Sequence, residues 1–118
     1  MKSLLKVTKS LADRNRVRIV LALLEHDELC ACQLIELLGI SGATASRHLG
    51  QLVQADLIES RKDGRWVYYM LAAGVRQLDI IKWLSAEATI SDEWRADSWK
   101  LREILSTDPL DLCKKQRS

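Results

Sequence analysis

The chain has 118 residues, of which 47% are apolar and 29% charged, and its 18 basic and 16 acidic side chains give a net charge of +2. This length predicts one domain over residues 1–118, and the composition excludes collagen-like and disordered chains. No apolar run is long enough to cross a bilayer and the N-terminal segment carries too much charge for a signal peptide, so we expect a cytoplasmic protein with three reduced cysteines.

Helical apolar spacing runs through the first half of the chain. Asp13 has the chemistry of an N-cap for a helix reaching Glu25, and the leucines from Leu4 to Leu11 indicate another helix before it. Two short helices follow, one with a stripe of Ala31, Leu34, Ile35 and Leu38, the other capped by Ser41, and Gly39 separates them. This arrangement predicts a helix-turn-helix over about residues 31–55.

The pattern then changes to that of extended chain. Residues 57–62 and 65–71 are strand-like, and Asp63-Gly64 between them is a strong hairpin signal, so we expect a wing over about residues 57–71. Helical stripes return over about residues 75–106, and a polar tail, 107–118, carries Cys113. The predicted fold is therefore mainly α with a small β-hairpin (α+β), a winged helix-turn-helix.

This order of elements favours DNA binding, because a major groove admits one helix while a ribbon reaches the adjacent backbone. Helix-turn-helix geometry also occurs in proteins that bind no DNA, and the same side chains then form an ordinary solvated surface. The predicted DNA contacts are Ala43, Thr44, Ser46, Arg47, His48 and Gln51 on the second helix of the pair, and Arg61, Lys62 and Arg65 on the wing.

Cys30 and Cys32 are candidate ligands for a soft ion. If the stripe beginning at Ala31 faces the core, each cysteine lies about 100° to one side of it, which argues against two small core side chains. Cys30 occupies the N-cap position, with Gln33 three residues on as in a capping box, and a helix N-terminus favours the thiolate. On an ideal helix the two side chains point about 160° apart, so joint ligation requires the first turn to unwind.

The segment from Glu28 to Leu71, preceded by Ser10 to Leu24, resembles the ArsR/SmtB family of bacterial metal-responsive repressors. The most diagnostic parts are SRHL (residues 46–49) and DGRWVYY (residues 63–69). The resemblance implies a homodimer whose first and last helices pair across the two-fold axis and whose repression of operator DNA is relieved by a ligand. The apolar C-terminal stripes also favour a dimer, because they exceed what one small winged helix can cover.

The ELCAC segment (residues 28–32) is similar to the ELCVC of the arsenic-responsive branch, which implies trivalent arsenic or antimony as inducer. In that branch a third cysteine stands where this chain has Ile35, so Cys113 is the remaining candidate ligand. An extended tail from Leu105 could span about 26–29 Å, enough to reach a site in either subunit. The alternative is a free thiol on a mobile tail. No organic cofactor is expected.

The predicted function is a metalloid-responsive repressor. It binds operator DNA and is released from that DNA when trivalent arsenic or antimony binds at Cys30, Cys32 and Cys113. Three alternatives stay open: a thiol-based redox-sensing repressor, a repressor that responds to lead or cadmium, and a DNA-binding or interaction module without ligand response. An enzyme is not expected, because the chain has neither a glycine-rich phosphate loop nor a C-x-x-C motif. The zinc- and nickel-type members of the family that the chain resembles use His and carboxylates on the final helix. The resemblance therefore implies no such site here, because the two histidines, His26 and His48, precede Gly74.

Overall fold

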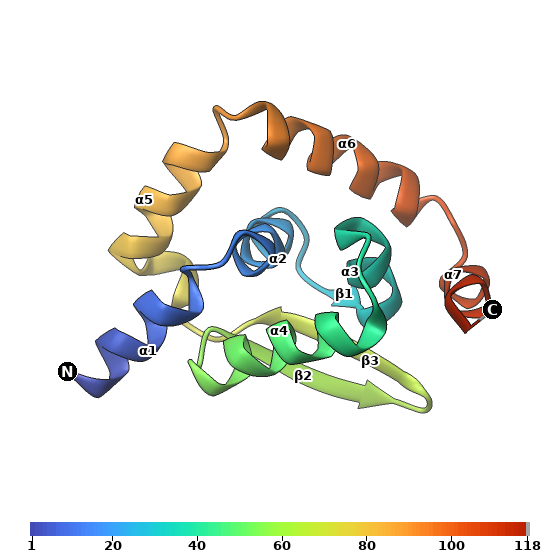
Figure 1. Cartoon of the computed structure of the whole chain (residues 1–118), viewed down its shortest axis with the longest axis horizontal. Helices are drawn as coiled ribbons and strands as arrows, with labels where there is room; N and C mark the ends of the chain where they lie inside the picture. Colours follow the sequence, from blue (N-terminus) through green and yellow to red (C-terminus); the bar gives the residue numbers. More distant parts are fainter. Residues whose placement is uncertain (118) are drawn as a thin grey trace.

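The structure is a computed structural model that describes residues 1–117, and its elements confirm a mainly α-helical winged helix with a small antiparallel sheet. The helices, shown in Figure 1, are α1 (Lys2–Ser10), α2 (Arg14–Glu25), α3 (Ala31–Leu38), α4 (Gly42–Gln54), α5 (Asp79–Ala88), α6 (Asp92–Leu105) and α7 (Pro109–Arg117), with a 3-10 turn, η1, at Val75–Gln77. The strands are β1 (Leu29–Cys30), β2 (Ile58–Asp63) and β3 (Trp66–Leu71).

Helix α2 forms the centre of the core. Its first turn is capped by the Asp13 carboxylate, which accepts hydrogen bonds from the backbone N–H groups of Asn15 at 2.8 Å and Arg16 at 3.2 Å, as the sequence predicts. Ile19 and Leu23 are fully buried. In Figure 1, α5 and α6 arch over α2 while α3, α4 and the sheet enclose it from the other sides. The elements predicted to contact DNA are therefore built on one shared core.

The helix-turn-helix consists of α3 and α4. Gly39 ends α3 with a φ of 65°, a left-handed conformation that glycine adopts without steric cost. Ser41 then caps α4 by accepting a hydrogen bond from the Thr44 N–H at 3.1 Å. Both signals confirm the predicted turn between the two helices.

The wing is part of a three-stranded sheet in the order β1-β3-β2, whereas the sequence predicts only the hairpin. Asp63 pairs with Trp66, so the two-residue turn is Gly64-Arg65, one position later than predicted. Gly64 has a φ of 61°, which suits such a turn. The additional strand, β1, pairs Leu29 with Tyr69 and Cys30 with Tyr68. One of the cysteines therefore belongs to the wing sheet.

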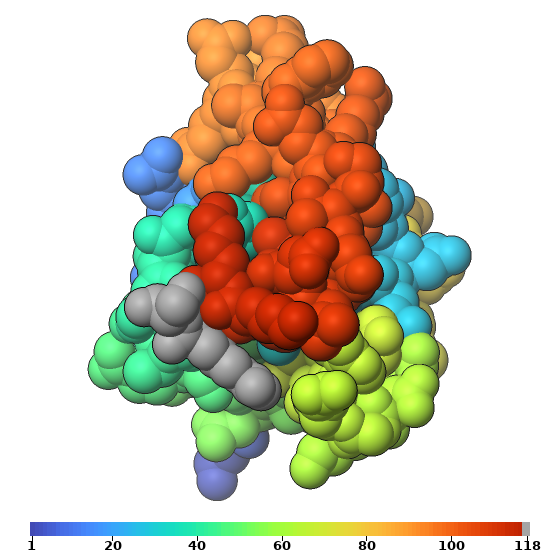
Figure 2. Space-filling view, turned by 90° about the vertical axis from the view of Figure 1, so that its right-hand side faces the viewer, coloured from blue at the N-terminus to red at the C-terminus, as the bar shows by residue number. Residues whose placement is uncertain are grey.

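The end of the chain is helical, and the predicted polar tail over residues 107–118 is wrong for its described part. Asp108 accepts a hydrogen bond from the Leu110 N–H at 3.0 Å, and Pro109 is the first residue of α7. Leu112 is only 5% exposed and joins the main core. Figure 2 shows α7 at the surface between α3 and the wing. Within residues 1–117, none of the helices is both apolar enough and long enough to cross a membrane.

Candidate nucleic-acid interface and thiol site

Helix α4 presents a continuous polar surface opposite its buried stripe. Ala45, Leu49 and Leu52 are buried, which leaves the predicted contact residues Ala43, Ser46, Arg47 and Gln51 exposed. Thr44 is half-buried, and its hydroxyl oxygen lies 3.4 Å from Arg47 Nη2. Small hydroxyl and amide side chains flanking one arginine suit both phosphate oxygens and base edges.

His48 differs from the other predicted contacts, because it faces α2 rather than solvent. Its side chain is 15% exposed, and Nδ1 lies 3.8 Å from the Asp13 carboxylate and 3.4 Å from Arg16 Nη1. Although partial burial acts to raise the pKa of Asp13, hydrogen bonds from the Arg16 and Asn15 N–H groups and the positive charge of His48 lower it overall. His48 thus links α4 to the capped start of α2.

The three predicted wing cations differ in their surroundings. Arg61 donates to both Glu28 oxygens, with Nε at 2.7 Å and Nη2 at 2.5 Å, and lies 4.5 Å over the Tyr68 ring. This pairing lowers the pKa of the Glu28 carboxyl. Lys62 and Arg65 are exposed, Arg65 at the tip of the hairpin. Arg61 is therefore engaged within the protein, and Lys62 and Arg65 are the wing cations that face solvent.

Cys30 is buried, contrary to the sequence prediction that it avoids the core. It is 1% exposed, because the buried side of this segment follows Cys30, Leu34 and Leu37 rather than the predicted stripe. Its backbone is extended, with a φ of −81° and a ψ of 159°, and its N–H donates to Gln33 Oε1 at 2.9 Å, which confirms Cys30 as the N-cap. The predicted angle of 160° between the two cysteines assumed that both are helical, and it is wrong because Cys30 is not.

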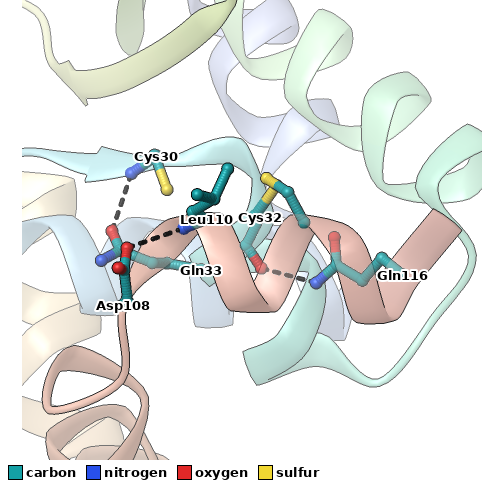
Figure 3. Close-up of a disulfide and its surroundings, with 7 residues drawn as sticks. Cys30, Cys32, Gln33, Asp108, Leu110 and Gln116 are labelled. Atoms are coloured by element: carbon teal, nitrogen blue, oxygen red, sulfur yellow. Dashed lines mark hydrogen bonds between the residues drawn. A yellow bond between two sulfur atoms is a disulfide. The ribbon is translucent and has the colours of Figure 1, made fainter.

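Cys32 and Cys113 are joined in a disulfide between α3 and α7, with Cα atoms 5.6 Å apart, whereas the sequence predicts reduced thiols (Figure 3). Two polar contacts hold the helices together beside it. Gln116 Nε2 donates to the Cys32 carbonyl at 2.8 Å, and Lys115 Nζ pairs with Glu36 at 2.9 Å. Cys113 therefore lies beside Cys32 of its own chain, in helix α7 and not on an extended tail, and its role as a ligand stays a prediction.

The three cysteines border one cavity of about 240 Å³. Its wall also includes the first residue of the recognition helix and the end of the wing. The lining residues are Cys30, Ala31, Cys32, Ile35, Gly42, Arg65, Trp66, Val67, Cys113 and Gln116. Among the residues that the structure describes, no three His, Cys, Asp or Glu side chains already form a metal site, so joint ligation by the thiols requires a rearrangement.

A cluster that the sequence did not reveal fixes the turn of the helix-turn-helix. The Leu37 carbonyl at the end of α3 accepts hydrogen bonds from Arg18 Nη2 and Lys100 Nζ, both at 3.1 Å. Arg18 also forms a two-point ion pair with Asp97 at 2.8 and 2.9 Å, which raises the pKa of the guanidinium. Arg18 and Asp97 are 79 residues apart, and each alone looks like an ordinary surface charge in the sequence. The sequence therefore gives no sign that they pair.

Residues 13–60 match the model of a family described as "Bacterial regulatory protein, arsR family". The chain is 38% identical over 101 residues to the arsenical resistance operon repressor of Escherichia coli K12, a match covering 86% of this chain and 80% of that one. It is 44% identical over 63 residues to the cadmium resistance regulatory protein CadC of Listeria innocua, covering 53% of each chain and thus about half of that relative's length. The solved structure of HlyU from Vibrio cholerae superposes with a TM-score of 0.67 at 27% identity, over 75% of this chain and 94% of that one.

Proposed function

Because this chain belongs to the arsR family of bacterial regulatory proteins, we propose that it is a transcriptional repressor released from operator DNA by trivalent arsenic or antimony. One observation carries the proposal. The three cysteines share a cavity with Gly42 at the start of α4 and with the wing residues Arg65 to Val67. A ligand that rearranges the thiols therefore acts directly on both DNA-reading elements.

The thiols have the donor chemistry that a trivalent metalloid requires. Soft ions prefer thiolate ligands, and three sulfurs satisfy a three-coordinate ion. Cys32 and Cys113 already lie at bonding distance, so reduction of their disulfide leaves two adjacent thiols, with Cys30 on the wall of the same cavity. Each bond to arsenous acid replaces one hydroxide and releases it as water with the thiol proton. Bringing Cys30 to the pair strains β1, and this strain is the energetic link to DNA.

Operator recognition would use α4 in the major groove and the wing along the backbone. Arg47 is the exposed cation of α4, and Lys62 and Arg65 are those of the wing that face solvent. Counterion release at phosphate contacts makes such binding weaken steeply with salt. The outward-facing residues Ala43, Ser46 and Gln51 supply the shorter contacts.

A homodimer would place two copies of α4 and the wing on one operator. Leu4 and Leu5 of α1 are 59% and 55% exposed, and Trp83 of α5 is 63% exposed. Apolar side chains this large are normally covered, and a second copy supplies the matching surface. Sedimentation at micromolar concentration should give a dimer, and Leu5→Glu combined with Trp83→Glu should give a single chain. A monomeric mass for the unaltered protein would contradict this assembly.

Arsenite titration of the reduced protein on a labelled DNA fragment from upstream of its own gene tests the inducer. We expect loss of roughly a hundredfold in DNA affinity, equivalent to about 2.7 kcal/mol of coupling. Cys32→Ser and Cys113→Ser should bind DNA and lose the response, because each removes half of the adjacent pair. Ile35→Val, which alters the same cavity without touching sulfur, is the matched control. Release of DNA from the Cys32→Ser, Cys113→Ser double variant by arsenite would show that the site is wrong.

The disulfide itself favours a second candidate function, a redox-sensing repressor. Oxidation would join Cys32 to Cys113 with loss of two electrons and two protons, and a small-molecule thiol would reverse it. A disulfide-forming oxidant such as diamide should then release DNA without any metalloid. An oxidised protein that binds DNA as tightly as the reduced one would exclude this candidate and leave the first intact.

A further inference from the structure

The wing sheet places Cys30 and Arg61 in one transverse row. Cys30 pairs with Tyr68 across β1 and β3, and Tyr68 pairs with Arg61 across β3 and β2. Residues directly opposite one another on antiparallel strands project to the same face. The contact of 4.5 Å between the Arg61 guanidinium carbon and the centre of the Tyr68 ring agrees with this geometry.

Glu28 lies beside this row, immediately before β1 in the chain. It precedes Cys30 by two residues, and its two carboxylate oxygens accept hydrogen bonds from Arg61 at 2.7 and 2.5 Å. The planar guanidinium fork binds carboxylate and phosphate in the same two-point geometry. Arg61 therefore cannot hold Glu28 and a DNA phosphate in this way at the same time.

We propose that Glu28 is an internal competitor for Arg61 that keeps this wing cation from the DNA backbone. The inference rests on the proposed function, in which the wing lies along that backbone. Glu28 immediately precedes β1, whose residues Leu29 and Cys30 are buried, so the core holds the backbone next to this carboxylate in place. The Arg61 side chain is 48% exposed, so a DNA phosphate can reach the same guanidinium that Glu28 holds.

The variant Glu28→Gln tests the competition in the protein without any metalloid. It should bind the upstream DNA fragment about two- to fivefold more tightly, the range that an exposed ion pair allows. The dependence of log affinity on log salt should steepen by about 0.9 for each wing that gains a phosphate contact. Glu59→Gln is the matched control, because Glu59 lies on the same face of β2, two residues from Arg61, and forms no ion pair within the described chain.

A second background separates competition from general repulsion between Glu28 and DNA. In protein that carries Arg61→Ala, the additional Glu28→Gln substitution should no longer raise the affinity for DNA. An equal gain in that background, or equal effects of Glu28→Gln and Glu59→Gln, would overturn the proposal. Failure of the unaltered protein to bind the fragment would contradict the proposed function itself, and this measurement comes before any comparison of variants.

Discussion

Helix α4 and the wing, the two parts of this molecule that we propose contact DNA, are held in place by different forces. Helix α4 is fixed by buried Ala45, Leu49 and Leu52, and its exposed surface carries little charge. In β2 every residue after Ile58 is exposed, and Arg61 is held by the Glu28 carboxylate and by its contact with the Tyr68 ring. Burial gives α4 a rigid location suited to reading bases, whereas a surface ion pair leaves the wing adjustable.

The largest effect is expected when a buried side chain that holds α4 on the core is removed. Leu49→Ala should lower the free energy of unfolding by about 2–5 kcal/mol, because it leaves a cavity beneath the helix. Urea denaturation followed by circular dichroism measures the loss. Val53→Ala on the same helix is the control, since Val53 is 39% exposed and should lose far less. Equal losses would mean that Leu49 does not anchor the helix.

Arg47→Ala tests the reading surface without disturbing the anchor. We expect operator affinity to fall by about 1–3 kcal/mol if Arg47 reads a base, while the unfolding transition stays unchanged. Binding to specific and unrelated DNA distinguishes base reading, which affects only the former, from a phosphate contact. Arg102→Ala, at an exposed position of α6, should have no effect on binding.

Asp13→Ala weakens the contact between α2 and the recognition helix. Loss of the cap should cost about 1 kcal/mol of stability at neutral pH. The pKa of Asp13 is below its ordinary value of 3.8 in the folded protein, so its contribution is present above that value and disappears as the pH falls through the lower folded pKa. Acid unfolding should therefore affect the variant less than the unaltered protein between about pH 5 and 2. Identical acid profiles would contradict this role.

The smallest expected effects belong to the wing. Arg65→Ala should lower the salt slope of DNA binding by about 0.9 per wing, because Arg65 faces solvent at the hairpin tip. Arg61→Ala should change it less, since Glu28 already occupies that side chain. The sequence alone places both arginines among the wing contacts without distinguishing them. Slopes measured by fluorescence anisotropy at several salt concentrations decide between equal and unequal roles.

Features with local causes were predictable from the sequence. The Asp13 and Ser41 caps, the Gly39 stop and the hairpin each depend on residues within a few positions of one another. Cys30 was misplaced because two overlapping stripes fit α3, and the choice between them depends on packing against α2, α6 and α7. Asp108-Pro109 was ambiguous in a different way, since the pair ends one helix and also has the chemistry to begin another.

The contacts that define the thiol site and its surroundings were beyond sequence patterns. Glu28 and Arg61 are 33 residues apart, and Cys32 and Cys113 are 81 apart. Each pairing exists because separate elements meet on the core, and no local rule links the partners. The residue types were nevertheless informative, because thiols with metal-ligand chemistry and basic wing residues were identified before their partners were known.

The disulfide between α3 and α7 has a topological consequence. It closes a covalent ring between two residues that are 81 positions apart, and this ring contains α4 and the β2-β3 hairpin, so these elements cannot fully extend when the protein unfolds. Restricting the unfolded chain in this way corresponds to about 4.5 kcal/mol for a ring of this size. A metalloid that bridges Cys32 and Cys113 closes the same ring. Oxidant and inducer should therefore both raise the melting temperature, so that the form released from DNA is the one more resistant to heat.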